Sequence, residues 1–130
     1  MRKQKLITLE MTELVNAYAI VKFLQTETAF RMAKAVERGD LFIEKPFVMD
    51  YEGVLVQGMM DVFWLENDTV VLLDYKTDYV TESEELIERY QTQLQLYGDA
   101  LKRIFSVGEQ QVKVECLIYS FRLQDVIQVV

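Results

Sequence analysis

Two short apolar runs in the middle of the chain predict a β-hairpin. Residues 59–65 and 69–75 are rich in β-branched and aromatic side chains, and a polar segment beginning at Glu66 separates them. Such runs around an Asn-Asp pair are typical of two antiparallel strands joined by a tight turn. Because side chains alternate along a strand, each strand presents apolar residues on both sides. One side is expected to carry Val62, Trp64, Val71, Leu73 and Tyr75, and the other Met59, Phe63, Leu65, Val70 and Leu72.

The register of this hairpin brings charged residues together. If Asn67 and Asp68 form the turn, Asp61 on the first strand faces Asp74 on the second. Directly opposite residues of an antiparallel pair point to the same side, with Cβ atoms roughly 4.5–5.5 Å apart. Lys76, two residues after Asp74, points to that side as well. The sequence therefore predicts two carboxylates and one ammonium in a single patch, as a divalent-cation site with a neighbouring lysine requires.

A simpler interpretation of the same residues is structural. Asp74 and Lys76 would form a surface ion pair, and Asp61 would be a solvated residue on an open face of the sheet. The apolar residues on both sides of both strands weigh against this interpretation. A sheet that is covered on both faces offers little water to unpaired charges, and burying them is costly.

The rest of the chain predicts an α/β (α+β) fold with a mixed central sheet flanked by helices. Residues 9–38 have a helical pattern, with Asn16 and Thr26 as N-caps. Thr81 and Glu84 match a capping box and open a helix that continues to about residue 105. The strand after this helix should lie parallel to the strand before it, since a helical crossover connects them. Strands are expected over residues 41–49, 54–65, 69–76, 112–121 and 125–130.

Composition limits the class of protein. The 130 residues correspond to one domain, and 51% hydrophobic residues exclude a disordered chain. No apolar run approaches the ~20 residues of a membrane span, and the basic residues after Met1 are not followed by the apolar run of a signal peptide. A single cysteine, Cys116, excludes a disulfide framework and a cysteine-based zinc or iron–sulfur site. It fits a protein of the reducing cytoplasm.

Three short motifs carry a resemblance to a known family. They are Gly58-x-x-Asp61, Asp74-Tyr75-Lys76-Thr77-Asp78 and Tyr90-x-x-Gln93-Leu94-x-x-Tyr97. Over roughly residues 41–125 the chain resembles the RecB-type branch of the PD-(D/E)XK nucleases, and within it the C-terminal nuclease domain of AddA-type helicase–nuclease subunits. The resemblance implies a restriction-endonuclease-like core with the order α-β-β-β-α-β, and a metal-dependent DNA exonuclease activity.

The resemblance also implies roles for individual residues. Asp61 and Asp74 would bind Mg²⁺ or Mn²⁺, hard cations that prefer oxygen ligands, and the backbone carbonyl of Tyr75 would be a further ligand. Lys76 would orient the attacking water or stabilise the charge of the transition state. On the long helix, Gln93 and its neighbour Tyr97 would position the phosphate or a water molecule.

Two features bear on whether this chain is active by itself. Glu44, on the strand before Asp61, would either assist the metal or make a surface ion pair. The family usually has a metal-binding histidine on an upstream helix, whereas this sequence has no histidine. We therefore expect a fragment of a longer helicase–nuclease, with N-terminal helices over residues 9–38 and a single nuclease core over residues 41–130. Its partners would be DNA, the helicase domains of the same protein and a second subunit, with a role in recombinational repair of double-strand breaks.

Other functions remain possible from the sequence. A catalytically incomplete module would bind DNA ends or a partner subunit without cutting. A free-standing restriction-type nuclease would need a recognition domain, which the sequence does not show. The net charge of −7 argues mildly against DNA as a direct partner. Metal ions at the acidic pair and a basic surface on other domains would offset that charge.

Overall fold

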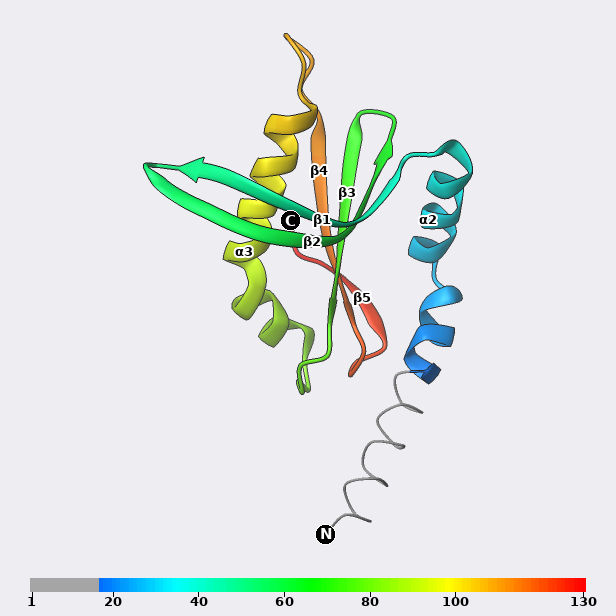
Figure 1. Ribbon diagram of the computed structural model, residues 1–130. Helices are drawn as coiled ribbons and strands as arrows, with labels where there is room; N and C mark the ends of the chain where they lie inside the picture. Colours follow the sequence, from blue (N-terminus) through cyan, green and yellow to red (C-terminus); the bar gives the residue numbers. More distant parts are fainter. Residues whose placement is uncertain (1–16) are drawn as a thin grey trace.

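A five-stranded sheet with helices on both faces forms the described part of the computed structural model, residues 17–130 (Figure 1). A helix over residues 17–24 comes first. The predicted helix over residues 9–16 and its N-cap Asn16 lie outside the described residues. The elements that follow are α2 (Glu27–Arg38), β1 (Leu41–Tyr51), β2 (Val54–Glu66), β3 (Thr69–Lys76), α3 (Ser83–Phe105), β4 (Lys113–Ser120) and β5 (Asp125–Gln128).

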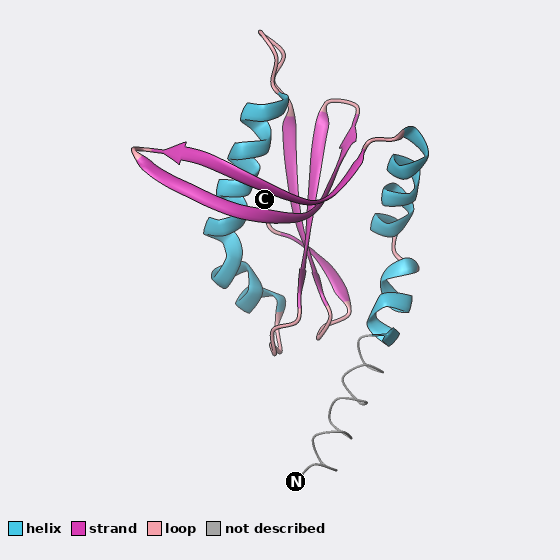
Figure 2. Cartoon of the chain, in the orientation of Figure 1, coloured by secondary structure: helices cyan, strands magenta, loops and turns pink. Residues whose placement is uncertain are grey.

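The sheet is mixed, which confirms the predicted fold class. Its strands lie in the order β1-β2-β3-β4-β5. β3 and β4 run parallel, and every other neighbouring pair is antiparallel. The parallel pair follows from α3, which connects the end of β3 to the start of β4 (Figure 2). β3 therefore lies at the centre, with β2 and β4 on its two edges.

Helices cover both faces of the sheet, so β3 is buried on both sides. On one face, Leu86, Leu94 and Leu101 of α3 cluster with Val70 and Leu72. α2 and the helix over residues 17–24 cover the opposite face (Figure 2). The second cluster consists of Ala19, Phe23, Ala35, Val62, Trp64, Val71, Leu73, Leu117 and Tyr119. Within residues 17–130, none of the helices is long and apolar enough to cross a membrane.

The alternation of β2 changes side at Asp61. Met60 and Phe63 are buried in the same cluster against α3, although strict alternation would place them on opposite faces. Met59, expected beside Phe63, is instead 55% exposed, so that prediction is wrong. β1 has a matching irregularity at Glu44, whose φ of +50° lies in the left-handed region. The register places Glu44 opposite Asp61, between two paired positions, and the hairpin bends there.

Beyond this bend, the outer half of the β1–β2 hairpin leaves β3 and lies across α3 (Figure 1). The ring of Phe47 packs edge-on against that of Tyr97, with 4.8 Å between the ring centroids. Near the tip, the guanidinium of Arg103 donates a hydrogen bond to the backbone oxygen of Asp50 at 3.2 Å. These two contacts fix the position of α3 relative to β2.

The start of α3 differs from the predicted capping box. The helix begins at Ser83, and its N-cap residue makes no side-chain hydrogen bond. The carboxylate of Glu85, rather than that of Glu84, accepts hydrogen bonds from the amide and the hydroxyl of Thr81, at 3.1 and 2.9 Å. Because the helix begins later than expected, Glu85 occupies the third helical position from which a carboxylate can reach back.

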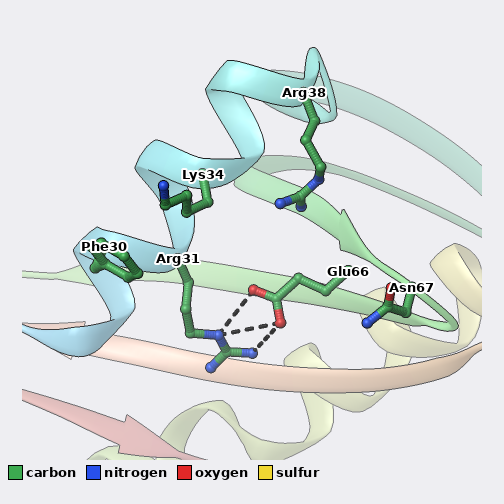
Figure 3. Close-up of a pocket in the computed structure, with 6 residues that line it drawn as sticks. All are labelled: Phe30, Arg31, Lys34, Arg38, Glu66 and Asn67. Carbon is green, nitrogen blue, oxygen red and sulfur yellow. Dashed lines mark hydrogen bonds and ion pairs between the residues drawn. The ribbon is translucent and has the colours of Figure 1, made fainter.

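One arginine ties α2 to the sheet. The helix begins at the predicted N-cap Thr26, whose hydroxyl accepts a hydrogen bond from an amide of the first turn. Farther along, Arg31 donates to both carboxylate oxygens of Glu66 at 2.9 Å (Figure 3), and to Glu115 at 3.2 Å. Trp64 Nε1 donates to Glu66 as well, at 2.8 Å. Hydrogen bonds from Arg31 lower the pKa of Glu66, so α2 is held to β2 and β4 by an ionised cluster.

The pocket beside this cluster has a volume of about 310 Å³, and its cations are paired with carboxylates. Besides Arg31, the guanidinium of Arg38 lies 3.1 Å from Asp40, and Lys34 lies 3.6 Å from Glu37. These charges hold α2 and its neighbouring strands together. The pocket is lined by Phe30, Arg31, Lys34, Arg38, Glu66 and Asn67 (Figure 3).

Replacing Arg31 should destabilise the fold. We expect Arg31→Met to lower the free energy of unfolding by about 2 kcal/mol more than Lys34→Met, because it leaves two carboxylates without their shared cation. Lys34 is the matched control, since it lies on the same helix and makes an exposed ion pair. Urea denaturation at neutral pH measures both losses. Equal losses in the two variants would contradict a role for Arg31 in holding α2.

Candidate functional site

Asp61 and Asp74 meet at the point where β2 separates from β3. The two strands pair from Glu66 opposite Thr69 to Val62 opposite Leu73, which is the predicted register. The next position outward would pair Asp61 with Asp74, but the ladder ends first. Instead, the carboxylate of Asp61 accepts a hydrogen bond from the backbone amide of Tyr75 at 2.9 Å. The side chain of Asp61 therefore occupies the place of the next backbone contact.

Asp74 is one of the few buried charged residues in the described part of the chain. Its exposed fraction is 5%, and its Oδ2 atom lies 2.8 Å from Nζ of Lys76. This ion pair is close, but the ammonium is not aligned with Oδ2 as a hydrogen-bond donor, and no other described group donates to that oxygen. A buried carboxylate oxygen without a hydrogen bond is unfavourable unless positive charge lies near it.

The surroundings raise the pKa of Asp74 to about 6. Burial is the largest cause, and the neighbouring carboxyl of Asp61 adds to it, whereas Lys76 acts in the opposite direction. Burial lowers the pKa of Lys76, but its hydrogen bond and charge contact with Asp74 outweigh burial and raise it. At neutral pH the site therefore holds two carboxylates and one ammonium, with an excess negative charge.

The donor set fits a hard divalent cation. Mg²⁺ and Mn²⁺ prefer carboxylate oxygens, and Mg²⁺ is commonly held by one or two carboxylates together with water and substrate phosphates. The unsatisfied oxygen and the raised pKa of Asp74 are the features that a nearby cation would relieve. Within residues 17–130 there is no group of three or more His, Cys, Asp or Glu residues that could hold a metal ion.

Glu44 is not brought into a cluster with the two aspartates. It is exposed, on the strand opposite Asp61, at the position of the bend. Among the described residues it makes no ion pair. The structure thus joins Asp61, Asp74 and Lys76, and leaves Glu44 at the edge of the group.

Gln93 and Tyr97 lie together on α3, where the helix meets the bent hairpin. The side-chain amide of Gln93 donates to the Tyr97 hydroxyl at 3.0 Å, and its Oε1 atom is buried without a hydrogen-bond partner among the described residues. Tyr97 closes over Gly58: a Cβ atom at Gly58 would lie 2.8 Å from the Tyr97 hydroxyl and 2.6 Å from the ring of Phe47. Only glycine allows this approach of hairpin and helix.

A family model described as the PD-(D/E)XK nuclease superfamily matches residues 2–128. The chain belongs to this superfamily of nucleases. The resemblance carried by the three sequence motifs is therefore confirmed, and the chain is a nuclease, a hydrolase. The arrangement of the five strands and α3 agrees with a restriction-endonuclease-like core.

Similar proteins place the nuclease beside one group of bacterial enzymes. The A-type subunit of an ATP-dependent helicase/nuclease from Clostridium perfringens (strain SM101 / Type A) is 38% identical, over 95% of this chain and 11% of that protein. Its namesakes from Clostridium botulinum (strain Loch Maree / Type A3) and Clostridium acetobutylicum are 37% and 31% identical, over 78% and 97% of this chain. The nuclease thus spans about a tenth of the length of the relatives that it matches.

The sequence alone did not indicate the contacts of Lys76 with α3. In the nuclease, Nζ of Lys76 lies 4.0 Å from the centroid of the Tyr90 ring. The Tyr90 hydroxyl in turn donates to Asp78 at 2.7 Å, and Arg89 donates to the same carboxylate at 3.0 Å. Tyr90 and Asp78 both occur in the motifs, but only the orientation of α3 shows that they lie against the lysine.

Asp74 should make the stability of the metal-free nuclease depend on pH. Because its pKa is raised from roughly 4 to about 6, its contribution is fully present below pH 4 and is lost as pH rises through 6. Asp74→Asn lacks this titration. We therefore expect its free energy of unfolding, relative to the parent, to rise by about 1–3 kcal/mol between pH 4 and pH 7. Urea denaturation in the presence of a chelator measures the difference, and a difference that does not change with pH would contradict the burial effect.

Proposed function

We propose that this nuclease is metal dependent and cuts DNA as the exonuclease domain of a longer helicase–nuclease. The observation that supports the proposal is the meeting of the Asp61 and Asp74 carboxylates beside Lys76, in a chain that belongs to a nuclease superfamily. The names of the similar proteins support the link to a helicase. The work of such an enzyme would be the processing of broken duplex ends in recombinational repair in the cytoplasm.

In the proposed mechanism, Asp61 and Asp74 hold Mg²⁺ or Mn²⁺ together with the backbone carbonyl of Tyr75. When bound, the ion lowers the pKa of a water molecule and stabilises negative charge on the scissile phosphate. Asp61 is held for this role by its hydrogen bond to the Tyr75 amide. Asp74 contributes the buried oxygen that has no hydrogen-bond donor.

The remaining residues act on the water and the phosphate. Lys76 orients the attacking water or stabilises the charge of the transition state, because its ammonium stays charged at neutral pH. Gln93 presents a buried oxygen without a partner and is held by Tyr97, so that it orients the phosphate or a water molecule. Glu44 supports the metal from the strand opposite Asp61.

Partners would supply what an acidic domain lacks. With a net charge of −7, the nuclease offers little attraction to DNA by itself. We propose that helicase domains of the same longer protein and a second subunit bring the DNA strand to Asp61 and Asp74. The metal ions would offset part of the repulsion at the site itself.

A second candidate is a docking module that binds DNA ends or a partner without cutting. The absence of histidine from the sequence, together with the absence of a third clustered ligand in residues 17–130, favours it. The intact pair of aspartates with Lys76 favours catalysis. The two functions differ in one result, which is whether the nuclease cleaves DNA in the presence of Mn²⁺.

Removing the site residues should abolish cleavage. We expect Asp74→Ala and Lys76→Ala to lower the rate of Mn²⁺-dependent cleavage of linear single- and double-stranded DNA by roughly 100-fold or more. Lys113→Ala and Asp68→Ala are the matched controls, because these residues form an exposed pair at the opposite end of the parallel strands. Site variants that cut as well as the parent would show that the site is wrong. A parent that binds DNA ends without cutting would support the docking module.

Metal binding should also stabilise the fold. When Mg²⁺ or Mn²⁺ is present at about ten times its Kd, we expect an increase of roughly 1–2 kcal/mol in the free energy of unfolding, because the ion binds only the native state. Thermal melting with and without the ion measures the shift. Asp61→Ala should remove the shift, and Asp68→Ala should keep it. A parent whose melting temperature does not respond to either ion would count against a preformed site.

A further inference from the structure

We propose that Tyr90 is a positioning residue that holds the ammonium of Lys76 beside Asp74, and that Asp78 fixes the tyrosine for this purpose. The inference deepens the proposed function and rests on it, since it assigns to α3 the placement of the lysine that acts on the phosphate. Neither Tyr90 nor Asp78 would touch the reacting atoms. Their effect would pass through Lys76 alone.

The first step of the argument is the contact between Lys76 and the ring. Nζ of Lys76 lies 4.0 Å from the centroid of Tyr90, and its side chain is only 17% exposed. An ammonium over the face of an aromatic ring is attracted by the ring quadrupole, more strongly where water is partly excluded. A lysine side chain is otherwise flexible and has many rotamers. Asp74 from β3 and Tyr90 from α3 hold its end from two different elements.

The second step is the anchoring of the ring. The Tyr90 hydroxyl donates to Oδ2 of Asp78 at 2.7 Å, and Arg89 donates to the same oxygen at 3.0 Å. The hydrogen bond from Tyr90 is the main cause of a lowered pKa for Asp78, so the acceptor is ionised at neutral pH. Asp78 belongs to the segment that leaves β3, only two residues after Lys76. The segment that carries the lysine is thereby tied to the tyrosine below it.

The third step explains why an aromatic face suits this position. A carboxylate that binds a metal ion has less negative charge to share with a neighbouring ammonium, so the contact between Asp74 and Lys76 would weaken in the loaded nuclease. A ring has no lone pair for a hard cation to take. Tyr90 therefore keeps its attraction for Lys76 when Asp74 is engaged elsewhere, and the lysine stays in place.

A purely structural role for Tyr90 gives a different expectation. Its ring is half-buried at the edge of the core, whereas Leu86 and Leu94 on the same helix are fully buried. If Tyr90 only filled space there, leucine would replace it without consequence for Lys76. If the ring face holds the ammonium, phenylalanine would serve and leucine would not.

Nuclear magnetic resonance of the 130-residue nuclease tests the contact without DNA or metal. The ε-methylene resonance of Lys76, assigned by its loss in Lys76→Ala, should be shifted upfield by the ring current of Tyr90. We expect Tyr90→Phe to keep this shift and Tyr90→Leu to remove it. Tyr18→Leu is the matched control, because Tyr18 is 60% exposed on the helix over residues 17–24, and it should keep the shift.

Kinetics test the consequence. Tyr90→Leu should lower kcat for Mn²⁺-dependent DNA cleavage by about tenfold, the loss expected from one desolvated cation–π contact. KM and the affinity for Mn²⁺ should stay within about twofold of the parent, since neither depends on the ring. Tyr90→Phe should restore kcat, and Asp78→Asn should give an intermediate value because the ring loses its anchor.

Each outcome decides a separate question. An ε-methylene resonance at its ordinary position in the parent, or a leucine variant with parental kcat, would overturn the role of Tyr90. An upfield shift in the parent together with undiminished cleavage by Lys76→Ala would leave the ring contact standing and overturn the proposed function of the lysine. A fall in Mn²⁺ affinity equal to the fall in kcat would show that Tyr90 acts on the metal ligands instead, against this proposal.

Discussion

The burial of Asp74 is the constraint on which the rest of the structure depends. β3 is covered by helices on both faces, so its last residues lie where charge is poorly screened. An ionised carboxylate is unfavourable there, as the raised pKa of Asp74 reflects. Asp61 adds a second carboxylate at the same place. Lys76 offsets one of these charges, and the fold tolerates the remainder because the apolar contacts of β3 on both faces stabilise the strand that carries it.

The hairpin and its acidic pair could be predicted because the information is local. The polar turn sets the register, and β3 spans residues 69–76 as expected. The change of side at Asp61 could not be predicted in this way. It depends on a left-handed backbone at Glu44, a conformation that glutamate does not require and rarely adopts. Contacts between distant elements were also hidden, since the meeting of Lys76 with Tyr90 depends on how α3 is rotated about its own axis.

The distribution of charge separates two kinds of ion pair. Arg31 and Glu66 join a helix to a strand, and hydrogen bonds align both groups, so this pair is satisfied within the protein. The pair of Lys76 with Asp74 is as short but leaves an oxygen without a hydrogen bond. A satisfied pair specifies how elements pack, whereas an unsatisfied one keeps capacity for a ligand. The same chemical groups therefore serve packing on one face of the sheet and chemistry at the end of the central strand.

The bend in the β1–β2 hairpin has a mechanical consequence. One continuous strand carries both Asp61 and the arm that lies across α3, and Gly58 is the point where the arm rests on the helix. The arm is thus a lever with its fulcrum at the bend. A body that pressed on its tip, near Asp50, would turn the backbone at the acidic pair directly, without any side chain relaying the motion.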